Sequence, residues 1–293
     1  MIKLVPANKA VIECRRTDYH VHPDYSIDAS PVSMRDYCKK ALELNLSEIC
    51  FTTHVELDSL RSDNLVRLNG EKISVLDFRW LDSYFEEIAK VREEFKPAGL
   101  EVKAGLEVGY SRGCEKQVEK TVNSYPFDFV MGAIHCLDHI AISSMKESPR
   151  YFQSKSLEEL RKDYFGTLME MAGTGLFDSI AHVDIYLRYG VRIYGPEIYA
   201  IHKGAVEPVF AEMARRGMGL EVNTSSRRRG LKEFHPARDM LALAAKSGIK
   251  VFTVGSDAHS PEELGGHIAE ALEILQEHGL RNHTFTRRRA RPV

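Results

Sequence analysis

The sequence predicts an α/β fold in which parallel strands alternate with helices and close into a barrel. Short apolar runs alternate along the whole chain with longer segments of helical period, which is the pattern of repeated strand–helix units. Seven such units indicate a barrel related to the eight-stranded kind. No linker, repeat or low-complexity stretch divides the 293 residues, so we expect one domain over residues 1–293.

The predicted strands are short apolar runs, and the predicted helices lie between them. The strand runs are residues 16–20, 48–53, 102–108, 127–134, 179–183, 218–222 and 250–254. Helical patterns include residues 80–95, 157–171, 196–215 and 236–246, some of which begin near a proline or end near a glycine. Residues 58–76 are polar and without a clear period, so they form either a lid or a simple insertion. The basic residues at the end, 286–293, are expected to be a solvated tail.

The charge and the cysteine content limit which partners and which cellular compartment can be expected. A net charge of −2 at pH 7 gives no overall field that would attract nucleic acid or membranes, so we expect neither as a partner. No apolar stretch approaches membrane-spanning length, and no signal peptide is evident. The cysteines are odd in number and lack C-x-x-C spacing, which favours free thiols in a reducing cytoplasm over disulfides or a thiolate zinc site. They are Cys14, Cys38, Cys50, Cys114 and Cys136.

Two acid–imidazole clusters near opposite ends of the chain indicate a metal site. Asp18-Tyr19-His20-Val21-His22 closes the first predicted strand, and Ser256-Asp257-Ala258-His259 follows the last one. Side chains two residues apart on a strand point the same way, so His20 and His22 can bind one ion together. A lone pair of this kind occurs by chance, but two clusters in one compact domain indicate a site for several ions.

Other metal-type side chains follow the predicted strands in the same way. They are His54 and Glu56 after the second strand, Glu107 at the end of the third, His135 after the fourth, His182 and Asp184 after the fifth, and Asn223 at the end of the sixth. Barrel enzymes build their active sites at the carboxyl ends of the strands. Scattered structural histidines would not collect on one rim, so we expect these side chains to form the active site. His202, His267, His278 and His283 lie in helical patterns or in the tail and are expected on the surface.

The order of these motifs resembles a known family. The successive motifs Asp18-x-His20-x-His22, Thr53-His54-x-Glu56, Gly105-Leu106-Glu107, His135, His182 and Ser256-Asp257-Ala258-His259 resemble those of the PHP (polymerase and histidinol phosphatase) family. The resemblance covers almost the whole chain and implies a distorted (β/α)7 barrel that holds up to three metal ions. Residues 175–184, 220–225 and 249–264 are similar to the histidinol-phosphate phosphatase branch of that family.

The resemblance implies three groups of ligands. One ion would take His20, His22, Glu107 and Asp257; a second would take Asp28, His54 and His259; a third would take His135 and His182, with Glu107 bridging to the first. Relatives carry either His or Asp at the position of Asp28. Thr53 stands where many relatives carry Asp, so a carboxylate that would orient His54 is missing from this position. Nitrogen and oxygen ligands without sulfur suit two to three ions of Zn²⁺, Mn²⁺ or Fe²⁺.

The implied activity is hydrolysis of a small phosphomonoester. Adjacent divalent ions lower the pKa of a bridging water and so provide hydroxide near neutral pH. The resemblance implies L-histidinol phosphate as the substrate, in histidine biosynthesis, with Glu107, Asp257 and His259 in the catalytic machinery. The leaving alkoxide must gain a proton, and Asp184 or water held by His259 is expected to give it. Cations that follow the fifth and sixth strands are expected to bind the phosphate, since guanidinium groups bind phosphate through two hydrogen bonds. The candidates are Arg188, Arg227, Arg228 and Arg229, and Arg188 with at least one of the other three is expected to contact the substrate.

Three other interpretations remain open. A PHP phosphodiesterase or exonuclease acting on nucleotides or oligonucleotides would share the metal site, but the near-neutral charge and the lack of a basic, aromatic groove argue against it. A non-catalytic relic would be expected to lose ligands, and this chain keeps the set. An amidohydrolase also begins with H-x-H, but it would normally show eight strands and a single terminal Asp.

Overall fold

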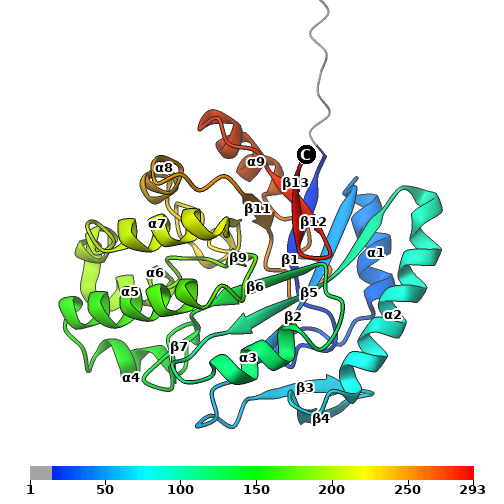
Figure 1. The fold of residues 1–293 in the computed structure, drawn as a ribbon, viewed down its shortest axis with the longest axis horizontal. Coiled ribbons are helices and arrows are strands. Elements are labelled where there is room, and N and C mark those ends of the chain that lie inside the picture. Colours follow the sequence, from blue (N-terminus) through cyan, green and yellow to red (C-terminus); the bar gives the residue numbers. More distant parts are fainter. Residues whose placement is uncertain (1–14) are drawn as a thin grey trace, which may run out of the picture.

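The computed structural model describes residues 15–293, in which seven parallel strands form one sheet that curls into a nearly closed barrel (Figure 1). In sheet order, which is also chain order, the strands are β1 (Thr17–Val21), β2 (Glu48–Glu56), β5 (Glu101–Gly109), β6 (Phe129–Ala133), β9 (Ser179–Ile180), β10 (Gly219–Asn223) and β11 (Phe252–Gly255). Each predicted strand corresponds to one of these, so the predicted fold class is confirmed. Cys14 lies outside the described residues; the other four cysteines are buried free thiols.

The first and last strands meet at the carboxyl end of the barrel. A parallel bridge joins Val21 to Ala258, and the His22 N–H donates to the Ala258 carbonyl at 2.9 Å. Asp18 is fully buried and reinforces this junction, because its carboxylate accepts hydrogen bonds from the backbone N–H groups of Ser256 at 2.9 Å and Gly265 at 3.0 Å. The closure explains how clusters near opposite ends of the sequence become neighbours.

Helices cover the outside of the sheet, with α1 and α2 on one side and α5 and α7 on another (Figure 1). The helices are α1 (Met34–Glu43), α2 (Arg79–Phe95), α3 (Glu115–Val122), α4 (Ser148–Phe152), α5 (Leu157–Thr174), α6 (Leu187–Tyr194), α7 (Val206–Arg216), α8 (Arg238–Lys246) and α9 (Ile268–Glu277). Trp80, Tyr84, Ile88 and Val91 recur every three or four residues along α2 and are buried, as an amphipathic helix requires.

The single helix predicted over residues 196–215 is wrong. The 3-10 helix η2 (Gly195–Ala200) is followed by a turn, and α7 begins only at Val206. Gly204 in that turn has a φ of 78°, a left-handed conformation that interrupts an α-helix. Two further 3-10 helices are η1 (Lys96–Ala98) and η3 (Arg227–Arg229).

The polar segment 58–76 is an insertion that folds into a hairpin. Its strands, β3 (Leu65–Leu68) and β4 (Glu71–Ser74), are joined by Asn69 and Gly70, both with positive φ, as a two-residue hairpin turn requires. Val66 bridges to Ser26 in the loop after β1, so the hairpin lies at the carboxyl end of the barrel. A smaller hairpin, β7 (Cys136–Leu137) with β8 (Ile140–Ala141), follows β6 at the same end.

The C-terminal residues expected as a solvated tail form a third hairpin, β12 (His283–Thr286) with β13 (Arg289–Pro292). Residues 286–293 are mostly exposed, but the hairpin is held in place because the Phe285 side chain is buried in the barrel interior. Its ring packs 4.7 Å from that of Phe129 and 6.1 Å from that of Tyr19, centroid to centroid. His283, expected on the surface, is buried for the same reason. This hairpin lies at the amino ends of the strands, beside β1 in Figure 1.

Candidate metal centre

The predicted ligands gather at the carboxyl end of the barrel. Histidine and carboxylate side chains form four groups whose donor atoms all lie within 4.8 Å of one another. The groups are His20 with His22 and Glu107; His22 with Asp257 and His259; His54 with Glu56 and His135; and Glu107 with His135 and His182. They border a cavity of about 370 Å³ that is also lined by Asp28, Arg188 and Arg229.

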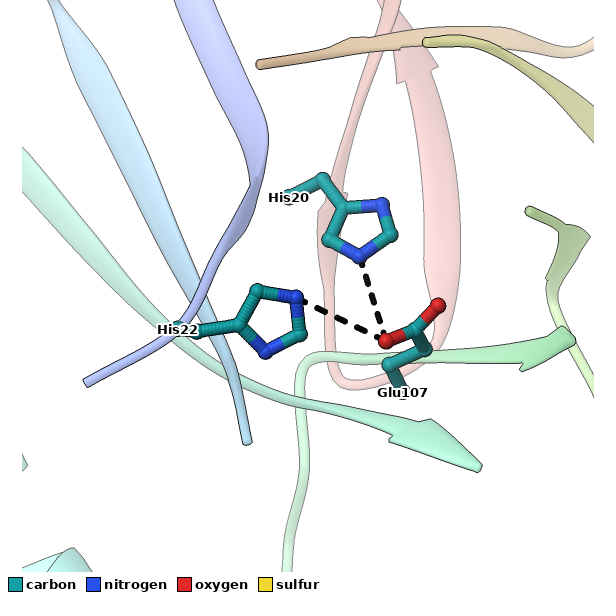
Figure 2. A group of neighbouring side chains, drawn as sticks. All are labelled: His20, His22 and Glu107. Carbon is teal, nitrogen blue, oxygen red and sulfur yellow. Dashed lines mark ion pairs between the residues drawn. The ribbon is translucent and has the colours of Figure 1, made fainter. Parts of the chain in front are cut away.

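The first group has the spacing of a metal site. The Oε2 atom of Glu107 lies 3.3 Å from His20 Nε2 and 3.5 Å from His22 Nε2 (Figure 2), and Asp257 Oδ1 lies 3.3 Å from His22 Nε2. Ligands about 2.0 Å from a tetrahedral zinc ion are about 3.3 Å apart. Among residues 15–293, neither buried Nε2 atom has a hydrogen-bond partner. Two imidazole nitrogens left unpaired beside two carboxylates fit a divalent ion.

Protonation of the first group follows from burial and charge. Burial and the nearby His259 lower the pKa of His22 to about 4, so its imidazole is neutral, which is the form that binds metals. Burial would also lower the pKa of His20, but Glu221, Glu107 and Asp257 raise it well above its usual value. Burial would raise the pKa of Glu107, but His20 and His135 hold it well below its usual range. Glu107 is therefore a carboxylate.

Glu221 orients His20 and was missed by the sequence analysis. Its Oε1 lies 2.6 Å from His20 Nδ1, which leaves Nε2 to face Glu107, and its Oε2 accepts the His182 N–H at 2.8 Å. Gly255 makes this packing possible, since a Cβ there would overlap both the Glu221 carboxylate and the His20 side chain. A signal was present in the sequence: Glu221 is the lone acid within the buried strand β10.

Asp28 and two histidines form a second set of donors. Asp28 Oδ2 lies 3.3 Å from both His54 Nδ1 and His259 Nε2. The loop that carries Asp28 is fixed by Arg67 of β3, whose guanidinium donates to the carbonyls of Asp24, Ile27 and Ala29 at 2.8 to 3.4 Å. The inserted hairpin therefore positions one predicted ligand.

Glu107 lies between the first set of donors and a third. Its Oε2 faces His20 of β1 and His22 just after that strand, whereas its Oε1 lies 2.8 Å from His182 Nε2 and 3.1 Å from His135 Nε2. One carboxylate with an oxygen in each group has the geometry expected of a ligand shared by two ions.

The four predicted phosphate-binding arginines do not act alike. Arg188 is buried at the cavity wall, where it donates to Ser225 Oγ at 3.1 Å and Asp257 Oδ2 at 3.2 Å. Arg229 also lines the cavity. Arg227 instead pairs with Glu270, and Arg228 donates to the carbonyls of Ser256 and Asp257 at 2.8 Å. Arg227 and Arg228 do not line this cavity, because three consecutive residues of a 3-10 turn point in three directions.

Asp184 does not face the cavity, which removes the observation that suggested a role as proton donor. It is fully buried, with Oδ1 2.6 Å from His235 Nδ1 and Oδ2 accepting the Ala237 N–H at 3.0 Å. Its carboxylate therefore holds the loop after β10. His202, expected on the surface, is likewise buried.

The inserted segment also forms one wall of the cavity. Arg61 lies between Asp63 and Glu147, with Nε 2.8 Å from Asp63 Oδ1 and Nη1 2.8 Å from Glu147 Oε2. All three side chains line the cavity. The cavity lining thus includes one arginine paired with two carboxylates, a feature that the sequence analysis did not predict because the residues come from loops far apart in the chain.

Comparison with known proteins agrees with this geometry. The family model of the PHP domain matches residues 18–225. A probable histidinol-phosphatase of Deinococcus radiodurans is 34% identical over 94% of this chain and 98% of its own length. The histidinol-phosphatase of Lactococcus lactis is 26% identical over 90% of this chain and 92% of its own length.

Solved structures share the fold. The histidinol phosphate phosphatase of Lactococcus lactis, crystallised with zinc, L-histidinol and phosphate, superposes with a TM-score of 0.79 at 24% identity, covering 94% of this chain and 99% of that one. The putative histidinol phosphatase of Listeria monocytogenes has a TM-score of 0.70 at 18% identity, covering 86% and 99%. Across residues 15–293, no helix is both long and apolar enough to cross a membrane.

Proposed function

The chain belongs to the PHP domain family, and from that premise we propose that it is a metal-dependent phosphomonoesterase that hydrolyses L-histidinol phosphate to L-histidinol and phosphate. The observation that carries the proposal is the pair of buried, unpartnered Nε2 atoms of His20 and His22 facing Glu107 and Asp257, within the part of the chain that the structure describes. A histidinol-phosphatase name on relatives that align over nearly the full chain supports the substrate. We propose that residues 15–293 act as one domain.

The proposed centre holds two to three divalent ions. The residues that would hold them are His20, His22, Glu107 and Asp257 in the first site, Asp28, His54 and His259 in the second, and Glu107, His135 and His182 in the third. When bound, such ions would supply a water-derived nucleophile at neutral pH and neutralise charge on the phosphate. The relative crystallised with zinc supports that metal, and the nitrogen and oxygen donors would also accept Mn²⁺ or Fe²⁺.

The protein's own cations and acids would position the substrate. Arg188 has an Nε atom without a partner among residues 15–293, so its guanidinium has a free N–H group with which to bind a phosphate oxygen. Arg229, on the same wall, would add a second cation. Asp63 and Glu147, which share Arg61 as a partner, line the same cavity, and their excess negative charge suits a substrate that carries a cationic group as well as a phosphate. His259, also at the cavity, can hold the water that protonates the leaving alkoxide.

A substrate panel tests the proposal. Phosphate release from L-histidinol phosphate, nucleoside monophosphates, phosphoserine and a short oligonucleotide would be compared with zinc, manganese or iron(II) supplied. We expect kcat/KM for histidinol phosphate to exceed that of the other esters by about 100-fold or more, since recognition of both charged ends discriminates strongly. Phosphate release from nucleotides but not from histidinol phosphate would overturn the proposal in favour of a nucleotide phosphoesterase.

A further inference from the structure

The residue before His54, Thr53, has no side chain that could orient the His54 imidazole. Thr53 is fully buried, and its hydroxyl has no hydrogen-bond partner within residues 15–293. His20, by contrast, is oriented by Glu221 through its Nδ1 atom. An imidazole binds a metal through one nitrogen, and the hydrogen bond made by the other nitrogen fixes its tautomer and orientation. Some other group must therefore fix the orientation of His54.

Glu56, two residues further along β2, is placed to do so. Its Oε1 lies 2.8 Å from His54 Nε2 and 2.6 Å from His135 Nδ1, and those two nitrogens are 3.0 Å apart, so a single oxygen faces both. Glu56 is 8% exposed, and its Oε2 has no partner among the described residues. Gly109, its register partner on β5, leaves the space, because a Cβ there would overlap the carboxylate.

We propose that Glu56 is a positioning residue that orients two metal-binding histidines at once. Its Oε1 accepts hydrogen bonds from the Nε2–H of His54 and the Nδ1–H of His135. His54 Nδ1 is then turned towards Asp28, and His135 Nε2 towards Glu107. The inference rests on the proposed function, because it assumes that ions bind at these positions.

The alternative, in which Glu56 is itself a ligand, is less compatible with the donor set. A neutral imidazole has one lone pair, so an ion bound to His54 Nε2 and His135 Nδ1 would leave N–H groups facing Asp28 and Glu107. An ion bound beside Glu56 would therefore take His54 away from the second set of donors and His135 away from the third.

Zinc binding and histidine tautomers test this role. Glu56→Gln keeps an acceptor oxygen, Glu56→Ala removes it, and Glu71→Ala changes an exposed glutamate of β4 as the control. Zinc per chain and its dissociation constants would be measured by equilibrium dialysis, and tautomers by long-range 1H–15N NMR of the zinc-loaded full chain. We expect His54 bound through Nδ1 and His135 through Nε2 in the native protein. In Glu56→Ala the affinity of the ions at these two histidines should fall by about 10- to 100-fold, and in Glu56→Gln by less than about tenfold.

Two results would overturn the inference. Equal loss of zinc in Glu56→Gln and Glu56→Ala would make Glu56 a ligand, and unchanged zinc affinity and tautomers in Glu56→Ala would leave it without a role. If circular dichroism shows that Glu56→Ala does not fold, Glu56→Gln decides: retained zinc and tautomers support the inference, and lost zinc overturns it. These readouts use zinc alone, so failure to hydrolyse histidinol phosphate would count against the proposed function and not against the role of Glu56.

Discussion

The two ends of the barrel bury polar and charged side chains in opposite ways. At the carboxyl end, buried nitrogen atoms of His20, His22 and Arg188 are left without hydrogen-bond partners among residues 15–293, although carboxylates lie nearby. At the amino end, the C-terminal hairpin provides partners for Tyr19 and Asp178, although Asn282 Oδ1 beside the hairpin has none among these residues. The Phe285 N–H donates to the Tyr19 hydroxyl at 2.6 Å, and the Arg288 Nε donates to Asp178 at 2.6 Å.

This difference separates a ligand-binding site from a region of the fold in which the protein's own groups pair with one another. A buried polar atom without a partner costs about 1–3 kcal/mol, so a group of them is retained where a ligand completes the bonding. At the amino end the hairpin itself supplies partners for Tyr19 and Asp178. The paired groups at the amino end are buried in a medium of low dielectric constant. Burial raises the pKa of Glu48 to about 7, while the hydrogen bond from the Tyr19 hydroxyl and the charge of Lys103 oppose this shift.

Of all the changes, removing the Glu107 carboxylate should cause the largest loss of function at the carboxyl end. In Glu107→Gln we expect turnover to fall by about 1000-fold or more and bound metal to fall with it, because this side chain contacts two sets of donors. Steady-state kinetics and metal analysis of the purified protein check this result. A variant that keeps wild-type turnover would refute a centre built around Glu107.

Removing the hairpin's aromatic anchor should affect stability instead. Phe285→Ala leaves a cavity beside Tyr19 and Phe129, so the free energy of unfolding should fall by about 3–5 kcal/mol. Denaturant unfolding measures this loss. The kcat of the folded, metal-loaded variant should stay within about twofold of the native value, since the ring lies at the end away from the cavity; a large loss of kcat at native metal content would mean that the two ends are coupled.

Arg67 offers an intermediate case, in which one side chain supports the site from the inserted hairpin. Arg67→Lys keeps the charge but cannot make the several hydrogen bonds to the carbonyls around Asp28. We expect the affinity of the second ion to fall by about 10- to 100-fold while the first ion is retained. Metal titration followed by calorimetry distinguishes the two, and unchanged binding of every ion would show that the hairpin does not support Asp28.

A matched pair of arginines should show the smallest and most selective effects. Arg188→Lys at the carboxyl end should raise the KM for the phosphate ester by about tenfold with little change in melting temperature, because a lysine keeps the charge and loses the bidentate geometry. Arg288→Lys at the amino end should lower stability by about 1–2 kcal/mol through its lost contacts with Asp178 and Leu176 and leave KM unchanged. The opposite pattern would reverse the roles assigned to the two ends.

The barrel and the ligand rim could be predicted because both depend on local sequence. Apolar runs mark buried strands, and a side chain that follows a parallel strand must lie at the carboxyl edge, so His54, Glu107 and His182 could be placed without knowledge of any contact. The pairing of His20 with Asp257 additionally required the barrel to close, which the alternation of strands and helices implies.

What could not be predicted depends on side-chain direction and on contacts distant in sequence. Arg227, Arg228 and Arg229 are adjacent in the sequence, yet only Arg229 reaches the cavity, because the turn of η3 separates their directions. Asp184 follows a strand as the ligands do, but His235 and a backbone N–H engage it away from the site. The C-terminal hairpin has a basic, tail-like composition, and a single buried ring, that of Phe285, decides its position.

Removal and return of the metal test the central claim most directly. The full chain would be freed of metal by dialysis against a chelator, and phosphate release from L-histidinol phosphate would be followed while zinc is added back and counted by mass spectrometry. We expect activity to fall to background in the metal-free protein and to return in proportion to zinc bound, up to two to three ions per chain, with no return in Glu107→Gln. A metal-free protein that keeps its full turnover would contradict the account.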